Sequence, residues 1–212
     1  MMRALVAREI RRALAGAAWL PVAFFLLVAT IVPFAIGPDA RLLARVGGGA
    51  LWIAALTAAL LPIERLIEPD RADGVLDQLA LRGITEEAVA VAKIIGHWLT
   101  FAPLLLLAAV PASLLLALDG SALMRAIVAL AVGTPALAAL AVAVAALTAG
   151  LPRAGSLSGL LLMPLAIPLV IFGAAATGDG GSGALKLEAA IALLIAAGAP
   201  FVTGAAIRAL RT

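Results

Sequence analysis

The chain has 212 residues, of which 65% are hydrophobic and only 13% are Asp, Glu, Lys or Arg. Soluble domains carry roughly 45–50% apolar and about 25% charged residues, so this composition excludes an ordinary soluble protein and indicates an integral membrane protein. The formal net charge of +3 comes from residues that flank apolar stretches, and it gives no reason to expect nucleic-acid binding.

Six stretches without Asp, Glu, Lys or Arg follow one another along the chain. They cover residues 13–38, 46–63, 94–118, 126–152, 154–178 and 189–207, with lengths of 26, 18, 25, 27, 25 and 19 residues. At about 1.5 Å per residue, each is long enough, or nearly so, to cross about 30 Å of hydrocarbon. None shows the polar and apolar alternation of a β-barrel. We therefore predict an all-α integral membrane protein with six transmembrane helices.

The cationic residues predict the orientation, because Lys and Arg are retained on the cytoplasmic side of a membrane. With the amino terminus inside, eleven of the fifteen Lys and Arg residues are cytoplasmic. Only Arg41, Arg45, Arg125 and Lys186 are external. Both termini and residues 64–93 are therefore expected in the cytoplasm, and residues 178–188 form an external loop.

The first 13 residues form an amphipathic pattern. Met2, Val6 and Ile10 share one helical face, and Arg8 and Arg11 lie on another. This pattern predicts a helix that lies in the headgroup plane and leads into the first span. A cleaved signal peptide is the alternative, but the apolar run that follows is longer than its usual 7–15 residues and five further spans come after it.

Residues 64–82 are the only long, densely charged run between two apolar spans. Pro69 interrupts the helix that leaves the membrane, and Asp73 is expected to cap a short amphipathic helix that Gly83 ends. Thr85 then caps the next helix. The residues expected to couple this helix to a partner are Asp73, Gly74, Val75, Leu76, Asp77, Gln78, Leu79 and Arg82.

Three interpretations of this short helix remain open. It can rest on the membrane surface, as amphipathic helices do, or it can dock a cytoplasmic protein. A third interpretation is metal binding by Asp70, Asp73 and Asp77, which begins like the Asp-x-x-Asp-Gly motif of membrane phosphatidyltransferases. The remainder of that motif is absent, so no metal site is predicted.

Three further features of the spans predict how their helices pack. Trp19 and Trp52 lie near span ends, where indole rings anchor at the membrane interface. Gly47-Gly-Gly49 predicts close helix contact or a local distortion. Pro164 and Pro168, four residues apart, predict a kink or break in the fifth span.

The chain contains no recognisable energy source or catalytic site of its own. It has no Gly-Lys-Ser/Thr phosphate loop, no Cys and one His, and Gly155-Ser-Leu-Ser-Gly159 does not have the Gly-x-Ser-x-Gly spacing. Charge-based proton coupling is not expected either, because the six spans carry no Asp, Glu, Lys or Arg. We therefore expect a protein that is not itself an enzyme and that another subunit drives.

His97 lies one turn after Lys93, near the cytoplasmic boundary of the third span. Neutral imidazole is a sound axial ligand for haem iron, so His97 with its neighbour Trp98 is a candidate haem contact. The alternative is a histidine that forms hydrogen bonds within the helix bundle.

The chain also resembles the haem exporter protein B family (CcmB), the permease subunit of the ABC transporter for cytochrome c maturation. The matching residues occur in order over nearly the whole chain: Ile36-Gly-Pro38, Leu42-Leu-Ala-Arg45, Trp52 followed by Ala54-Ala55, Glu64-Arg-Leu66, Asp73-Gly74, Gln78-Leu79, Ala92-Lys93, His97-Trp98, Gly133-Thr-Pro135, Pro164 and Ile167-Pro-Leu169.

This resemblance implies a single permease domain over residues 1–212 in a bacterial inner membrane. It implies two copies of the chain paired with two copies of an ABC ATPase subunit that binds ATP, with residues 73–82 as the coupling helix. It also implies haem as the transported ligand, neighbouring haem-handling membrane subunits and a periplasmic haem chaperone. The segment of residues 178–183 is shorter and richer in glycine than the family leads us to expect.

A membrane scaffold that translocates nothing is the alternative function. Intramembrane catalysis would need a catalytic site that the sequence does not contain.

Overall fold

The computed structural model describes residues 2–15 and 19–211, and within these ranges the chain is helical and contains no strand. This confirms the predicted all-α class. The elements are α1 (Met2–Ala15), α2 (Leu20–Ile36), α3 (Ala40–Leu60), the 3-10 turn η1 (Ile63–Arg65), α4 (Glu68–Ala72), α5 (Val75–Leu81), α6 (Glu86–Leu115), α7 (Gly120–Thr148), α8 (Ala154–Ala176) and α9 (Ser182–Ala209).

Five of the described helical stretches are long and apolar enough to cross a membrane, and the pair α1 and α2 makes a sixth if it is counted as one bent span. The two members of that pair meet at 59°. Within the predicted first span, residues 13–38, the structure has the end of α1, which extends to Ala15 beyond the predicted residues 1–13, and α2 from Leu20 onward. Residues 16–18, which fall inside the predicted span, lie outside the described part of the chain.

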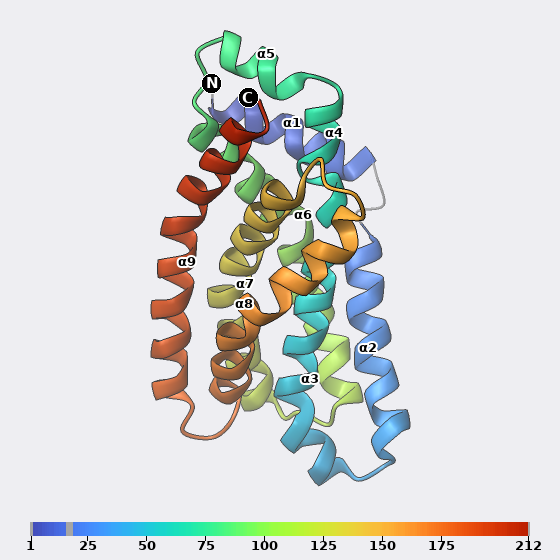
Figure 1. The fold of residues 1–212 in the computed structure, drawn as a ribbon. Helices are drawn as coiled ribbons and strands as arrows, with labels where there is room; N and C mark the ends of the chain where they lie inside the picture. Colours follow the sequence, from blue (N-terminus) through green and yellow to red (C-terminus); the bar gives the residue numbers. More distant parts are fainter. Residues whose placement is uncertain (1, 16–18, 212) are drawn as a thin grey trace.

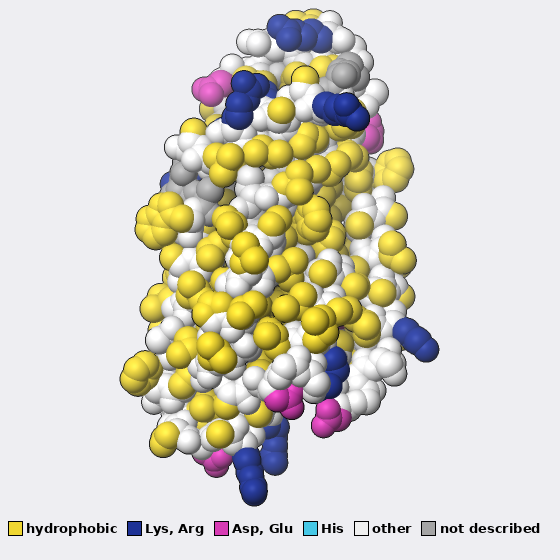
Figure 2. Space-filling model, turned by 180° about the vertical axis from the view of Figure 1, so that it is seen from behind, with side chains coloured by type: hydrophobic (Ala, Val, Ile, Leu, Met, Phe, Trp, Pro, Cys, Tyr) yellow, Lys and Arg dark blue, Asp and Glu magenta, His cyan; other side chains and the backbone are white. Residues whose placement is uncertain are grey.

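The bundle has two ends of different character (Figure 1). Both chain termini, α1 and α5 lie at one end, which we call the α5 end; the turns between α2 and α3 and between α8 and α9 lie at the opposite end. Figure 2 shows a broad hydrophobic band between the two ends, where the charged side chains on this face gather. Apolar surface between two charged rims is the pattern of a protein that crosses a bilayer.

α7 is the central helix. It packs against α3, α6, α8 and α9, and most of its residues from Ala126 to Thr148 are buried. Many of these residues are alanines, which let neighbouring backbones approach closely, as membrane bundles require in the absence of a large hydrophobic driving force. α8 and α9, by contrast, leave large apolar side chains such as Leu160, Leu193 and Phe201 exposed on the outside of the bundle.

Short polar residues begin the helices where the chain turns. Asp39 accepts backbone hydrogen bonds at the start of α3, Asp119 does so at the start of α7, and the hydroxyl of Thr85 accepts the Ala88 N–H at 3.3 Å. The prediction that Thr85 caps the following helix is thus confirmed. At Asp119, hydrogen bonds from the Ala122 N–H and then the Ser121 hydroxyl hold the pKa of the carboxyl below its usual range.

The prolines and glycines of the spans are accommodated within continuous helices. α8 passes through Pro164 and Pro168 as one helix, so of the predicted kink or break, the break does not occur. A Cβ added at Gly47 would lie 2.8 Å from the Leu118 side chain, and one at Gly48 would lie 2.8 Å from Thr177. The close contact predicted for the glycine run is therefore confirmed at these two positions.

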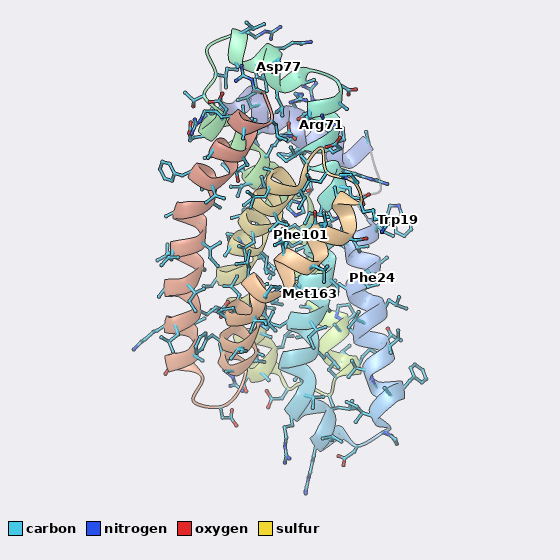
Figure 3. All side chains as sticks on the ribbon, in the orientation of Figure 1. Trp19, Phe24, Arg71, Asp77, Phe101 and Met163 are labelled. Atoms are coloured by element: carbon cyan, nitrogen blue, oxygen red, sulfur yellow. The ribbon has the colours of Figure 1, made fainter. Side chains whose placement is uncertain are left out.

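Trp52 is the largest side chain in the core and is fully buried. Its expected place at the membrane interface is therefore wrong, whereas Trp19 is 66% exposed and points outward from α2 (Figure 3). The indole lies between Gly133 of α7 and Gly173 of α8, where a Cβ on either glycine would overlap the ring. Two glycines on neighbouring helices thus create the space that the indole fills.

Replacing Gly173 with Ala is expected to destabilise the protein by about 1–3 kcal/mol, because the ring of Trp52 has no room to retreat in a packed core. Thermal unfolding of the purified protein in detergent measures this. Gly159 of the same helix is the matched control: a Cβ there would meet nothing within 4 Å, so Gly159→Ala should be neutral or slightly stabilising. Equal effects of the two substitutions would contradict the assigned position of Trp52.

Candidate functional site

α5 is a separate short helix at the α5 end of the molecule, set off by two glycines in the left-handed region. Gly74 has φ of 67° and Gly83 has φ of 72°. The predicted helix is therefore confirmed, but Asp73 does not cap it. Asp73 belongs to the turn that closes α4, where its N–H bonds to the carbonyl of Pro69, and Gly74 occupies the cap position of α5 without a side-chain hydrogen bond.

The two faces of α5 have different roles. Leu76 and Leu79 are buried, with exposed fractions of 4% and 8%. Leu79 and Arg82 face Leu5 and Ala4 of α1 across a shallow depression. Asp77 and Gln78 are exposed, in line with the predicted amphipathic pattern. Leu76 and Leu79 therefore pack α5 against the rest of the same chain, and their side chains are not available to a partner protein.

Leu81 is the residue of α5 that sequence reasoning missed. Its side chain is 87% exposed and lies beside the exposed side chains of Asp77, Gln78 and Arg82. We call these four residues the α5 outer face. In the sequence, Leu81 falls on the polar side of this short helix and interrupts its amphipathic pattern. An apolar side chain that breaks the polar face of a helix is itself the sign that could have identified it, because such a residue gains from contact with a partner.

Ion pairs connect α5 and the start of α6 to Arg208 of α9 and to Arg211, which follows that helix. Arg211 donates to Asp77 at 3.0 Å and to Glu86 at 2.6 Å. Arg208 donates to Glu87 at 2.7 Å. The charged groups are partly exposed, so each pair contributes little to stability. Their position matters more, because they join α5 to helices that run the length of the bundle.

Beneath α5, charged residues from three helices meet in a buried ion cluster, which consists of Arg8, Glu9, Arg12, Asp70 and Lys93. Asp70 is 2% exposed and accepts hydrogen bonds from Arg12 at 2.7 Å, from Lys93 at 2.5 Å and from Arg8. Lys93 also donates to the carbonyl of Leu66 at 2.7 Å. Opposite charges compensate one another here, as buried charges must. The cluster ties α1, α4 and α6 together.

The three aspartates considered for metal binding do not form one site. Asp70 is occupied by the cations of the ion cluster, and Asp77 binds Arg211. Across residues 2–15 and 19–211, no three His, Cys, Asp or Glu side chains are placed to hold a metal ion together.

His97 and Trp98, proposed together as a haem contact, point in different directions from α6. Trp98 donates its indole N–H to the Thr134 hydroxyl of α7 at 3.1 Å. His97 is buried, contacts the ring of Phe101, and lines a pocket between α1, α6 and the turn that follows α3. Only His97 therefore faces a space that could receive a ligand.

Glu188 is a further buried acid, and the charge-free stretches did not reveal it. We expected residues 178–188 to form a loop, but α9 begins at Ser182 and carries Glu188 into the bundle. The side chain is fully buried beside Gly133, and neither carboxylate oxygen has a hydrogen-bond partner among the described residues. α9 therefore begins before the predicted span 189–207 and carries an acid that this span did not include.

A Glu188→Gln substitution is expected to leave the protein at least as stable as the natural chain, because an unpartnered carboxyl in a core brings a penalty that the amide reduces. Thermal unfolding in detergent measures the difference. Glu188→Lys is the contrasting variant and should be strongly destabilising, since it places a cation in the same apolar position. A large loss of stability in Glu188→Gln would show that the carboxylate has a partner.

Comparison with known proteins gives one consistent result. The sequence matches the family described as CcmB protein over residues 1–210. The chain belongs to the CcmB family. It is 44% identical to heme exporter protein B of Rhodobacter capsulatus and 42% identical to that of Paracoccus denitrificans, in both cases over 98% of each chain. It is also 42% identical to heme exporter protein B of Escherichia coli K12, over 89% of this chain and 88% of the relative.

Several residues that carried the CcmB resemblance have structural roles in the fold. Trp52 fills the space beside Gly133, and Lys93 belongs to the buried ion cluster. Gly74 begins α5. The family resemblance therefore includes residues that hold α5 and the core of the bundle in place.

Proposed function

We propose that this chain is the transmembrane subunit of an ATP-driven system that exports haem for cytochrome c maturation. The names of its relatives, heme exporter protein B, support haem as the transported ligand. In this proposal, residues 1–212 form one ABC-type permease domain in the bacterial inner membrane. The α5 end, with both termini, lies in the cytoplasm, as the excess of Lys and Arg there favours.

The observation that carries the proposal is the α5 outer face. An ATPase that docks there meets an exposed leucine among polar side chains, and the buried face of α5 keeps the helix fixed to the bundle. Residues 73–82 then act as the coupling helix, and ATP is bound and hydrolysed by the partner. The chain itself is not an enzyme, and two copies of it with two ATPase subunits complete the transporter.

Three contacts can transmit a displacement of α5 to the membrane-spanning helices. The first is the short turn through Gly83 into α6, and the second is the ion pair between Asp77 and Arg211, two residues beyond the end of α9. The third runs through α4, where Asp70 connects to Lys93 of α6. Because these contacts join α5 to rigid helices, a rotation of α5 moves α6 and α9 together. Neighbouring haem-handling membrane subunits and a periplasmic chaperone receive the ligand.

A membrane scaffold that organises haem-handling subunits without translocating haem is the second candidate. The tight centre of the bundle favours it, since Trp52 fills the space between α7 and α8 and leaves no path there. A scaffold would still bind partners at α5, so binding alone does not separate the two functions.

Reconstitution in vesicles with the ATPase, the haem-handling subunits and the chaperone separates them. If the chain is a transporter subunit, ATP turnover is accompanied by the appearance of haem-loaded chaperone on the far side of the membrane. Turnover without any loaded chaperone would favour the scaffold. A complex with Leu81→Glu in this chain is the control, since it should show neither coupled turnover nor loading.

A further inference from the structure

An apolar groove of about 500 Å³ lies between α2 and α3, on the side of the bundle that carries the turn between these two helices (Figure 1). Val28, Val32 and Ile36 follow one another at intervals of four residues and line the groove from α2. Gly49 and Ile53 line it from α3. Ile53 is 53% exposed, so the groove opens on the outside of the bundle, where lipid tails lie.

Gly49 keeps this groove open. Gly47 and Gly48 of the same run are packed closely against other parts of the chain, whereas a Cβ added at Gly49 would meet nothing within 4 Å. Contacts within the described residues therefore do not require a glycine at position 49. Glycine lowers helix propensity, and here it leaves a space on the surface of α3 that an acyl chain can fill.

A polar pocket of about 570 Å³ adjoins the groove, and Arg45 and Ala174 line both spaces. The charged residues in its lining are Arg41, Arg45, Arg125, Asp119 and Asp179. Arg125 is paired with Asp179 at 2.9 Å, and Asp119 accepts hydrogen bonds at the start of α7. The guanidiniums of Arg41 and Arg45, in contrast, make no ion pair or hydrogen bond within residues 2–15 and 19–211. The pocket therefore has two cationic groups to spare.

Arg41 and Arg45 are one turn apart on α3, so two like charges lie on the same face of this helix. Such a pair is unfavourable by itself, and a bound anion relieves the repulsion. Arg45 is followed directly by the apolar stretch that begins at Val46, which places the pair at the level of the lipid headgroups. A guanidinium can bind a phosphate through two parallel hydrogen bonds.

We propose that the pocket and the groove form one site for an anionic phospholipid, whose phosphate binds Arg41 and Arg45 and whose acyl chain lies along the groove beside Gly49. α3 rises about 12 Å from Arg45 to Ile53, close to the roughly 15 Å of hydrocarbon in one leaflet. The cationic and apolar parts thus follow one another in the order that a phospholipid requires. A free phosphate ion is the competing occupant, but it would leave the groove unfilled.

This site is independent of the proposed function, because it concerns the leaflet at the end opposite α5 whichever side of the membrane that end faces. In the proposed orientation the lipid belongs to the outer leaflet. It would join α2 to α3 and to Ala174 of α8, since all three helices line the groove.

Native mass spectrometry of the purified full-length chain tests the site by titration with phosphatidylglycerol, or with phosphatidylcholine of the same acyl chains. The natural chain should bind phosphatidylglycerol about tenfold more tightly. Arg41→Gln combined with Arg45→Gln should remove this preference, because the charge-assisted contacts to the phosphate are lost. Lys186→Gln is the matched control: Lys186 is an exposed cation at the same end, on α9, and its replacement should change neither affinity.

Gly49→Leu tests the groove separately from the charges. The added side chain should weaken the binding of both lipids by about fivefold and leave the preference for phosphatidylglycerol in place. Gly159→Leu is the control, since Gly159 of α8 is equally open but does not line the groove. Thermal unfolding in detergent verifies that each variant is folded. Arg41 and Arg45 are exposed, so the arginine result decides the matter even if Gly49→Leu does not fold.

Three results would overturn the lipid site. The first is an unchanged preference for phosphatidylglycerol in the folded double arginine variant. The second is unchanged binding of both lipids by folded Gly49→Leu, because the lipids would then be held outside the groove. The third is displacement of phosphatidylglycerol by an equal concentration of glycerol 1-phosphate, which would assign the pocket to a free anion. Recovery of the ATPase partner with the double arginine variant should be normal, because α5 lies at the other end, so failure of the lipid site is distinguishable from failure of the proposed function.

Discussion

Replacing Asp70 with Asn is expected to destabilise the protein by about 3–5 kcal/mol, the usual cost of removing one partner from a buried ion pair. Asp70 is the anion that three cations share, and Lys93, with a side chain that is 1% exposed, would keep only the longer contact to Glu9 at 3.3 Å. The expected result is a large fall in the amount of folded protein in the membrane and in its thermal unfolding temperature in detergent.

Asp73→Asn is the matched control for this substitution. Asp73 lies three residues further along, is exposed, and its side chain forms no ion pair with the described residues, so its replacement should change stability by no more than about 0.5 kcal/mol. If Asp70→Asn were as well tolerated as Asp73→Asn, the buried ion cluster would not hold α1, α4 and α6 together.

Replacing Leu81 with Glu is expected to abolish recovery of the ATPase subunit with this chain while leaving the chain folded. The side chain is 87% exposed, so the substitution disturbs no internal packing. In the complex, however, it would bury a carboxylate where an apolar contact is expected, and truncation or replacement of such a central contact costs about 2 kcal/mol or more. Co-purification from membranes that contain both proteins measures the effect.

Leu151→Glu is the matched control for the docking prediction. Leu151 is 49% exposed in the connection between α7 and α8, at the same end of the bundle but outside α5. It should leave recovery of the ATPase unchanged. Equal recovery with Leu81→Glu and Leu151→Glu would exclude the α5 outer face as the docking surface, and Leu76 or Leu79 could not replace it, because both are buried.

Local patterns predicted the elements that depend on neighbouring residues. Apolar stretches located the long helices, and the glycines at 74 and 83 with Thr85 located α5 and the start of α6. Figure 3 shows Asp77 on α5 at the end of the molecule that bears both termini, in agreement with the predicted charged segment between two spans. These features are determined by helix propensity, helix capping and hydrophobicity, which are properties of short stretches of sequence.

The features that sequence reasoning missed depend on contacts between distant parts of the chain. Asp70 and Arg8 pair across a sequence separation of 62 residues, and no local pattern indicates that pair. Trp52 was expected at the interface because it lies near the end of a predicted span, whereas the two glycines that make room for it in the core, Gly133 and Gly173, come from other helices. Glu188 was assigned to a loop because a charged residue usually ends a span, yet α9 simply continues past it.

The most direct test of the account is the side of the membrane on which α5 lies. The chain has no cysteine, so a Gln78→Cys variant carries a single reactive thiol on the α5 outer face. A membrane-impermeant maleimide should label it in inside-out vesicles, less so when the ATPase is bound, and should not label it in intact spheroplasts. Gly183→Cys at the opposite end should show the reverse pattern. Labelling of Gln78→Cys in intact spheroplasts would contradict the proposed role of α5.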